Sequence, residues 1–251
     1  MMQGKKIFFA SDFHLGSDGK FSSKEREKII VEWLSSIENK AEAIYLMGDI
    51  FDYWFEYKEV VPRGFTLLLG KLHDLRLKGV PVIFFTGNHD MWIFDYLEKE
   101  MDIQVKRKPV IEIFNNKIFF LAHGDGLGNV PLGDKLMKIA FSNSFLQWLF
   151  ARIHPNTGIR IMKFFSNVSR NTHSEYSEEF IQEKEFLLQF AEDYIKNDDS
   201  IDYFVFGHRH IPVKYPLSNS RSFMVNLGDW IENFTYGEFD GEQFNIRKYD
   251  F

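Results

Sequence analysis

Five short segments of the chain carry aspartate, histidine or asparagine directly after an apolar run. They are Asp12-Phe13-His14, Gly48-Asp49-Ile50-Phe51-Asp52, Gly87-Asn88-His89-Asp90, His123-Gly124-Asp125 and Gly207-His208-Arg209-His210. Carboxylate, amide and imidazole donors suit Mn²⁺, Zn²⁺ or iron. The chain has no cysteine, which excludes thiolate ligands and disulfides. The pattern therefore predicts a metal site built from oxygen and nitrogen donors.

These candidate ligands are numerous enough for two ions. Asp12 and His14 alternate in an extended segment, so their side chains point the same way. Asp49 has two carboxylate oxygens and could bridge two ions. Two ions about 3.5–4 Å apart stabilise both the attacking and the departing oxygen of a phosphoryl transfer. The predicted chemistry is hydrolysis of a phosphate ester or a phosphoric anhydride.

Two residues of the third segment are candidates for catalysis. His89 is free beside the ligands, and as an imidazolium it could stabilise the transition state or protonate the leaving oxygen. Asp90 follows it and is expected to orient it. Taken singly, each segment has an ordinary explanation, such as a turn or an Asx loop. Five in order, each at the end of an apolar run, indicate one shared site.

The elements that must position these residues are short strands separated by helices. Helices are predicted at Ser23–Asn39, where Ser22 and Glu25 have capping-box spacing, and at Phe65–Leu77. The predicted strands are Lys6–Ser11, Ala43–Met47, Val80–Thr86, Ile111–Phe114, Lys117–Ala122, Tyr203–Phe206, Phe223–Leu227, Phe234–Phe239 and Gln243–Lys248. This alternation is typical of an α/β sheet with crossover helices, whose sites form beyond the carboxyl ends of the strands.

Composition narrows the function classes. The formal net charge is −6, from 30 basic and 36 acidic side chains, which argues against a broad nucleic-acid surface. Neither a signal peptide nor a run long enough to span a membrane is apparent, and a cytoplasmic location is expected. Residues 1–251 are expected to form one catalytic domain. Residues 134–174 are expected to form a helical insertion within it, acting as a lid.

The insertion is basic and aromatic. Between Lys135 and Ser174 there are six basic residues and no acidic one. Apolar residues such as Phe145 and Trp148 alternate with them at helical spacing. The ordinary explanation is a helical hairpin packed on the core with a solvated basic face. The alternative is an interfacial element or a lid over a lipid with an anionic head group.

Taken together, the five segments resemble the calcineurin-like metallophosphoesterase superfamily. That resemblance implies a four-layer αββα sandwich, α/β (α+β) in class, and two divalent ions, Mn²⁺ in the first place, with Zn²⁺ or iron as alternatives. It also implies that one ion is held by Asp12, His14, Asp49 and His210. The other ion would be held by Asp49, Asn88, His123 and His208.

A narrower resemblance is to the UDP-2,3-diacylglucosamine pyrophosphohydrolase family of lipid A synthesis. It rests on His123-Gly124-Asp125-Gly126-Leu127, the aromatic-basic insertion, Arg170-Asn171 and Leu227-Gly228-Asp229-Trp230. It implies cleavage of a nucleotide-linked glycolipid into UMP and 2,3-diacylglucosamine 1-phosphate. The enzyme would work peripherally on the cytoplasmic face of the inner membrane, with no obligate protein partner. The candidate substrate-binding residues in the insertion are Arg160, Lys163, Arg170 and Asn171.

One residue departs from the narrower pattern. Many members of the lipid family have arginine where this chain has His89, which is the residue of the wider superfamily. An enzyme acting on another anhydride or ester, or a soluble phosphatase or phosphodiesterase, therefore stays open as an alternative. A non-catalytic scaffold would be expected to lack some of the ligands, all of which are present here. A nuclease is disfavoured by the net acidity.

Overall fold

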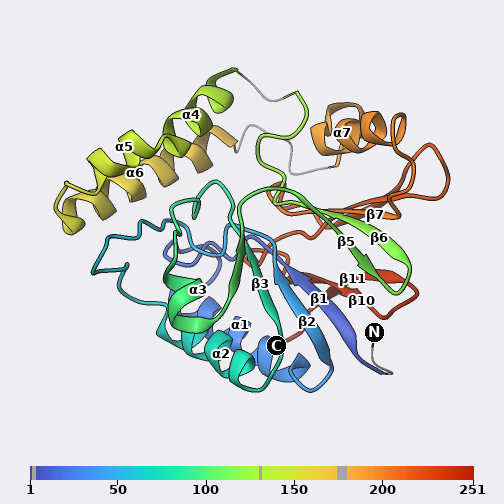
Figure 1. Ribbon diagram of the computed structural model, residues 1–251, viewed down its shortest axis with the longest axis horizontal. Helices are drawn as coiled ribbons and strands as arrows, with labels where there is room; N and C mark the ends of the chain where they lie inside the picture. The colour runs from blue at the N-terminus through green and yellow to red at the C-terminus, as the bar shows by residue number, and fades with distance from the viewer. Residues whose placement is uncertain (2–3, 130–131, 174–179) are drawn as a thin grey trace.

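The computed structural model describes residues 1, 4–129, 132–173 and 180–251, and these fold as two β-sheets packed face to face (Figure 1). The first sheet has the order β11 (Phe244–Lys248), β10 (Thr235–Phe239), β1 (Lys6–Ala10), β2 (Ala41–Leu46), β3 (Val82–Phe85) and β4 (Gln104–Lys106). The second has the order β5 (Val110–Phe114), β6 (Lys117–Leu121), β7 (Tyr203–Phe206), β9 (Phe223–Asn226) and β8 (Val213–Pro216).

Because the strands in the middle of both sheets are parallel, the loops that carry the five polar segments lie at the same edge of the sheets. β1, β2, β3 and β4 run parallel to one another, and so do β6, β7 and β9. All five polar segments follow one of these parallel strands, so each emerges at a carboxyl end. In sheets of this kind, sites form beyond that edge.

Aromatic packing fills the space between the sheets. Phe9 of β1 stacks on Tyr45 of β2 at 5.2 Å between ring centroids and on Phe119 of β6 at 6.1 Å. All three are buried and belong to one cluster. These ring contacts therefore join the two sheets. Buried aromatic surface of this size dominates core energetics.

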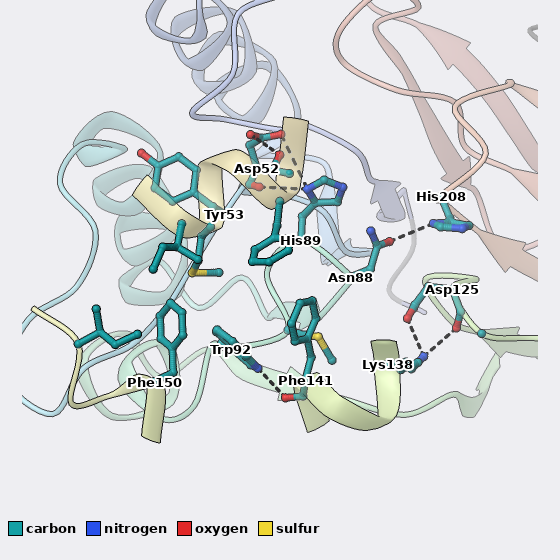
Figure 2. Close-up of a pocket in the computed structure, with 17 residues that line it drawn as sticks. Asp52, Tyr53, Asn88, His89, Trp92, Asp125, Lys138, Phe141, Phe150 and His208 are labelled. Carbon is teal, nitrogen blue, oxygen red and sulfur yellow. Dashed lines mark hydrogen bonds and ion pairs between the residues drawn. The ribbon is translucent and has the colours of Figure 1, made fainter. Parts of the chain in front are cut away.

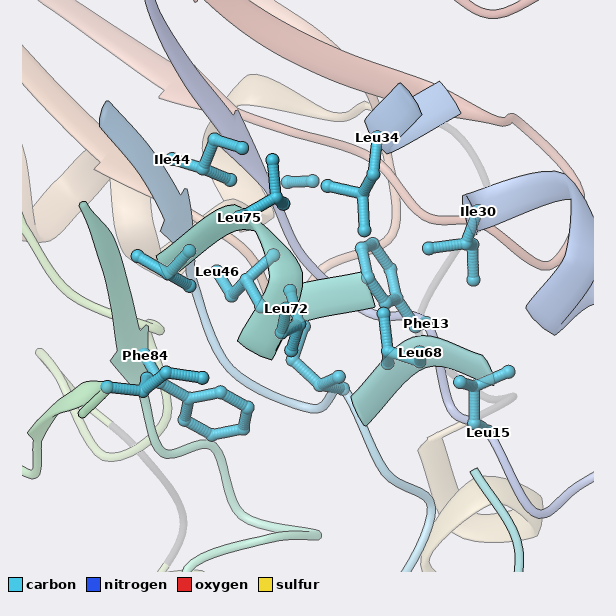
Figure 3. Close-up of a cluster of buried hydrophobic side chains, with 14 of the residues drawn as sticks. Phe13, Leu15, Ile30, Leu34, Ile44, Leu46, Leu68, Leu72, Leu75 and Phe84 are labelled. Carbon is cyan, nitrogen blue, oxygen red and sulfur yellow. The ribbon is translucent and has the colours of Figure 1, made fainter. Parts of the chain in front are cut away.

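Helices cover the outer face of each sheet. On the first sheet lie α1 (Ser23–Ile37), α2 (Thr66–Leu77) and α3 (Tyr96–Met101), and on the second lies α7 (Phe186–Ile195), preceded by the short η1 (Gln182–Lys184). Figure 3 shows Leu68, Leu72 and Leu75 of α2 directed at the buried side chains of the first sheet. The four layers are therefore α, β, β, α, and the predicted sandwich is confirmed.

Local sequence signals account for several element ends. The predicted capping box is present, since Ser22 accepts a hydrogen bond from the Glu25 amide while Glu25 accepts one from the Ser22 amide. Asn115 and Asn116 both have positive φ in the turn between β5 and β6, as a tight hairpin requires. The strands β4 and β8 and the helices α3 and α7 were not predicted. Three of these four are only three to six residues long.

The insertion forms three helices between β6 and α7. They are α4 (Leu132–Ser142), α5 (Ser144–Phe150) and α6 (Pro155–His173), which lie together at one end of the molecule (Figure 1). Its first helix begins two residues before the predicted boundary at residue 134, and Ser174 lies outside the described residues. α6 begins at Pro155, because proline is well suited to the first position of a helix. Among the described helices, none has the length and apolarity needed to cross a membrane.

Candidate metal centre and adjoining cavity

The loops after β1 and β2 continue the pairing of their strands. The Asp12 amide donates to the Gly48 carbonyl at 3.0 Å, and the His14 amide donates to the Asp49 carbonyl at 3.0 Å. Backbone groups in a buried loop need such partners. The two loops are thereby held side by side, which brings the side chains of Asp12, His14 and Asp49 to one place.

Backbone strain is concentrated at the candidate ligands. Positive φ angles occur at Asp12 (57°), His14 (44°), Asp49 (53°), His208 (69°) and His210 (58°). A non-glycine residue in this region costs on the order of 1–3 kcal/mol and persists only where its surroundings fix it. Five strained residues at five predicted ligand positions indicate a site rather than five unrelated turns.

Glycines let these loops approach one another closely. A Cβ atom at Gly87 would lie 2.2 Å from Asp49 Oδ1, and one at Gly207 would lie 2.6 Å from Asp12 Oδ2. Neither position has room for a side chain. The absence of a side chain here is therefore a requirement of the site and not only of turn geometry.

The structure brings all seven predicted ligands together. Three groups have ligand atoms within 4.8 Å of one another, namely Asp12 with His14 and His210, His14 with Asp49 and His89, and Asp49 with His123 and His208. Asn88 joins the last group, because its Oδ1 lies 3.1 Å from His208 Nδ1.

Asp49 lies between the two halves of the cluster. Its Oδ1 accepts a hydrogen bond from the His89 amide at 2.8 Å. Its Oδ2 lies 3.8 Å from His14 Nε2 and 3.2 Å from His123 Nε2. One carboxylate oxygen thus faces histidines of both predicted ion sites, which is the position that a bridging ligand would need.

Three histidines are oriented in the same manner. Their Nδ1 atoms face an oxygen: His14 faces Asp52 Oδ1 at 3.3 Å, His123 faces the Met47 carbonyl at 2.9 Å, and His210 faces Asp229 Oδ2 at 3.2 Å. A ring that donates from Nδ1 has its Nε2 lone pair free to bind a metal. In each case Nε2 faces the carboxylates of Asp12 or Asp49.

The buried carboxylates of the cluster favour positive charge on the groups around them. Burial lowers the pKa of His123 and of His210, but the carboxylates around them, chiefly Asp49 and Asp12 respectively, outweigh burial and raise each pKa to about 10. The pKa of Asp49 is lowered, since His123 and His89 outweigh the effect of burial. Burial and the charge of His123 lower the pKa of His208 to about 3.

These residues fit a pair of divalent ions. The donor set is carboxylate, imidazole and amide, which matches borderline and hard divalent metals. His123 Nε2 is buried and lies 3.2 Å from Asp49 Oδ2. An imidazole nitrogen and a carboxylate oxygen held this close in a buried site are both suited to binding the same divalent ion. Asp12, His14, Asp49 and His210 could hold one ion, and Asp49, Asn88, His123 and His208 the other.

Asp90 holds backbone rather than the imidazole of His89. Its carboxylate accepts hydrogen bonds from the amides of Ile50 (2.8 Å), Phe51 (3.3 Å) and Gly87 (2.7 Å). It thereby joins the second and third loops. Burial, together with the charge of Asp49, raises the pKa of Asp90 to about 7. Within the part of the chain that the structure describes, the expected contact between Asp90 and the His89 ring is not formed.

Asp52 performs the orienting role instead. The Asp52 carbonyl lies 3.0 Å from His89 Nδ1, and its carboxylate faces His14. Burial lowers the pKa of His89, despite the opposing effect of Asp49. The imidazolium expected from the sequence is therefore disfavoured in the protein alone. A negatively charged substrate beside the ring would favour it again.

A cavity of about 320 Å³ opens between the insertion and the core (Figure 2). Its metal-facing end is lined by Asn88, His89 and His208, which belong to the cluster. Its walls are mainly apolar and come from both the core and the insertion: Tyr53, Met91, Trp92, Phe141, Phe150, Ile153, Ile161, Met162 and Phe165. The Trp92 indole donates to the Phe141 carbonyl at 2.7 Å and joins the two walls.

The substrate-binding residues predicted in the insertion do not line this cavity where their side chains are described. Arg160 and Lys163 are exposed, and the Lys163 ammonium lies over the Tyr53 ring at 4.9 Å. The side chains of Arg170 and Asn171 lie outside the described residues, so their roles remain predictions.

Some residues of the site were not assigned a role from the sequence, among them Lys138, Asp52 and Asp229. Lys138 lines the cavity and pairs with Asp125 at 2.6 Å, although it was counted only as part of the basic insertion. The sequence signal for this role was its position three residues before Phe141, which places both side chains on the same face of the helix. Asp52 and Asp229 lie within recognised segments, but only the folded geometry shows that each faces a histidine.

Comparisons with known proteins agree with this geometry. The model of the "Calcineurin-like phosphoesterase" family matches residues 5–212. A protein of Porphyromonas gingivalis named UDP-2,3-diacylglucosamine hydrolase is 39% identical, over 94% of this chain and 94% of its own length. One of the same name from Aeromonas salmonicida is 25% identical, over 89% of this chain and 85% of its own.

Among solved structures, an archaeal phosphodiesterase has the same fold. The superposition gives a TM-score of 0.50 at 14% sequence identity and covers 96% of this chain and 98% of the other. At this level of identity, the likeness concerns the fold alone.

The position of Asp49 between the two halves of the cluster yields a prediction. Asp49→Ala should lose both ions, because a single carboxylate oxygen faces histidines of both sites. Bound metal is measured by elemental analysis after dialysis, with circular dichroism to verify folding. Glu59→Ala, which removes an exposed carboxylate, should retain both ions. Two ions bound to folded Asp49→Ala would rule out the bridging role.

Proposed function

Because the chain belongs to the calcineurin-like phosphoesterase family, we propose that it hydrolyses the pyrophosphate of UDP-2,3-diacylglucosamine to UMP and 2,3-diacylglucosamine 1-phosphate. The observation that carries the proposal is the cavity, whose apolar walls lead directly to His89, Asn88 and His208 of the metal centre. A substrate with an acyl chain and a pyrophosphate needs these two environments side by side.

The character of the cavity favours a lipid over a small polar ester. Ligand pockets use apolar surface for affinity and a few polar groups for orientation. Here the polar groups gather at the metal-facing end, where Lys138, Asp125 and His208 lie, while Phe150, Ile153 and Ile161 supply apolar wall. An acyl chain would occupy the apolar part and leave the pyrophosphate beside the cluster.

Two divalent ions, Mn²⁺ in the first place, would supply Lewis acidity and a water of lowered pKa when bound. The protein's own contribution begins with orientation. Asp52, Met47 and Asp229 hold the imidazoles of His14, His123 and His210. In the reaction, the oxygen of water adds to one phosphorus, the anhydride bond breaks, and the second phosphate leaves with the bonding electron pair.

His89 is the group that can serve that departing phosphate. It lines the cavity and belongs to the cluster, and its Nδ1 faces the Asp52 carbonyl. Its Nε2 is then the atom available to the substrate. The negative charge of the pyrophosphate raises the pKa of an adjacent imidazole and so favours the imidazolium. From there it stabilises the transition state or donates a proton.

We also propose that the protein works peripherally on the cytoplasmic face of the inner membrane, and the insertion supports the contact with a lipid surface. Six large apolar side chains of α4 and α5 are exposed: Leu136, Ile139, Phe145, Leu146, Trp148 and Leu149. The Arg152 guanidinium lies over the Trp148 ring at 4.5 Å. Exposed apolar side chains next to basic ones, in a segment without acidic residues from Lys135 to Ser174, suit an anionic lipid surface.

Substrate cleavage tests the proposal. With Mn²⁺, UDP-2,3-diacylglucosamine should release UMP with a kcat/KM at least about a hundredfold above that of UDP-N-acetylglucosamine. Burial of about four methylenes, at ~0.8 kcal/mol each, is enough for this ratio. Ile161→Trp, which fills the cavity, should lower cleavage of the acylated substrate only.

A generic phosphodiester serves as the control for this comparison. If it is turned over while neither UDP-sugar is cleaved, the metal centre stands and the lipid substrate is wrong. If the two UDP-sugars react equally, the cavity does not bind the acyl chain.

Replacing His89 separates catalysis from metal binding. His89→Ala should retain both ions, because each ion has four other ligands, and should lower kcat by about 10²–10⁴-fold, the usual contribution of a general acid. Elemental analysis and steady-state kinetics measure the two effects. An unchanged kcat would remove His89 from the mechanism.

Vesicle binding tests the membrane proposal. The double variant Phe145→Glu with Trp148→Glu should reduce co-sedimentation with phosphatidylethanolamine–phosphatidylglycerol vesicles by at least about tenfold, since each buried aromatic contributes roughly 1.5–3 kcal/mol. Leu77→Glu alters an apolar residue that is 75% exposed but lies on α2, and should bind normally. If the double variant binds the vesicles as well as the Leu77→Glu variant does, the surface formed by α4 and α5 is not the membrane-binding surface.

A further inference from the structure

A hydrogen bond joins the insertion to the residues around the metal centre. Ser166, on α6, donates from Oγ to Asp52 Oδ2 at 2.7 Å. Both side chains are buried, with exposed fractions of 5% for Ser166 and 3% for Asp52. A buried hydrogen bond to a charged group contributes more than a neutral one at the surface.

Asp52 connects this bond to two residues of the site. Its second carboxylate oxygen, Oδ1, lies 3.3 Å from His14 Nδ1. Its backbone carbonyl lies 3.0 Å from His89 Nδ1. The carboxylate is planar, so a bond that fixes Oδ2 also fixes the direction in which Oδ1 points.

The orientation of His14 depends on that direction. When Nδ1 donates to Asp52, the Nε2 atom of His14 faces Asp12 Oδ1 at 3.8 Å and His210 Nε2 at 3.3 Å. Partners of this kind set both the tautomer and the ring orientation of a metal-binding histidine. Loss of the Ser166 bond would remove one of the contacts that orient the Asp52 carboxylate and would thereby loosen the His14 ring.

The helix that carries Ser166 also forms a wall of the cavity. Met162 and Phe165 of α6 line it, and Ser166 itself reaches it. Toward the start of α6 the helix packs tightly on the core, where a Cβ atom at Gly158 would lie 2.2 Å from the Tyr57 hydroxyl. α6 is therefore held at Gly158 and at Ser166, with cavity wall between these two points.

We propose that Ser166 is a positioning residue that links the seating of the insertion on the core to the geometry of the His14 metal ligand. The inference rests on the metal assignment of the proposed function, but not on the identity of the substrate. A ligand in the cavity would touch the same helix. The seating of α6 on the core and the order of the metal centre are therefore coupled. Such coupling is reciprocal: metal binding must stabilise the seated helix.

Metal affinity tests the first half of this link. Ser166→Ala should weaken the binding of one of the two Mn²⁺ ions by about threefold to tenfold. The effect should be small because Ser166 acts through Asp52, whereas loss of a direct partner of a ligating histidine lowers metal affinity by about 10–100-fold. Isothermal titration with Mn²⁺ alone measures this. Thr157→Ala removes an exposed hydroxyl from the same helix and should bind both ions normally. In an Asp52→Ala background, Ser166→Ala should add almost nothing.

Hydrogen exchange tests the reciprocal half. Adding Mn²⁺ to the native protein should slow amide exchange in α6 around Ser166, because the bound metal fixes His14 and Asp52. The same addition should have a smaller effect in Ser166→Ala and an undiminished one in Thr157→Ala. A merely structural hydroxyl would change exchange equally with and without metal.

Two results would overturn the inference. One is native affinity for both ions in Ser166→Ala, and the other is equal metal-induced protection of α6 in native protein and variant. Neither measurement uses a substrate, so failure of the lipid assignment leaves them unaffected. If the native protein bound no Mn²⁺, the metal assignment in the proposed function would be wrong instead.

Discussion

Burial of charge at the carboxyl ends of the strands is the constraint on which this structure depends. Asp12 is fully buried and Asp49 is 2% exposed, and both lie among imidazoles. Ionised groups away from water are costly unless they are paired or bind a metal. These carboxylates outweigh burial and raise the pKa of His123 and of His210, which reflects the same need for positive charge beside them.

The sandwich supplies the rigidity that this cluster needs. Five candidate ligands have left-handed backbone, which persists only where neighbouring structure fixes it. The loops are fixed by mutual backbone bonds, such as that of the Asp12 amide to the Gly48 carbonyl, and by Asp90, which binds amides of two loops. Beneath them, Phe9, Tyr45 and Phe119 join the two sheets.

The insertion places a second environment against the first. Its helices provide an apolar wall that ends at the imidazoles of His89 and His208, and Ser166 ties that wall to Asp52. Charge stabilisation and apolar burial oppose each other within one site, because a low dielectric penalises unpaired charge. Here they are adjacent but separate, with apolar side chains along the cavity and the charged groups at one end of it.

The four-layer sandwich was implied by the family resemblance. What the residue types by themselves determined were most of the strands and the set of candidate ligands, from Asp12 to His210. Both are local properties: a strand is visible as a short apolar run, and a ligand as a polar residue after it. Only the tertiary structure decided which group orients which. Asp90 follows His89 in sequence yet binds the amides of Ile50 and Gly87, while Asp52, 37 residues earlier, faces the His89 ring.

The same distinction applies to the insertion. Its helical and basic character was readable from residue types, but the side chains that line the cavity were not. Lys138 and Ser166 reach it, whereas the Arg160 and Lys163 side chains do not line it. Which face of a helix meets a ligand depends on how the helix packs on residues distant in the chain, such as Trp92 and Asp52. Sequence spacing fixes the faces of a helix, and only packing decides what each face meets.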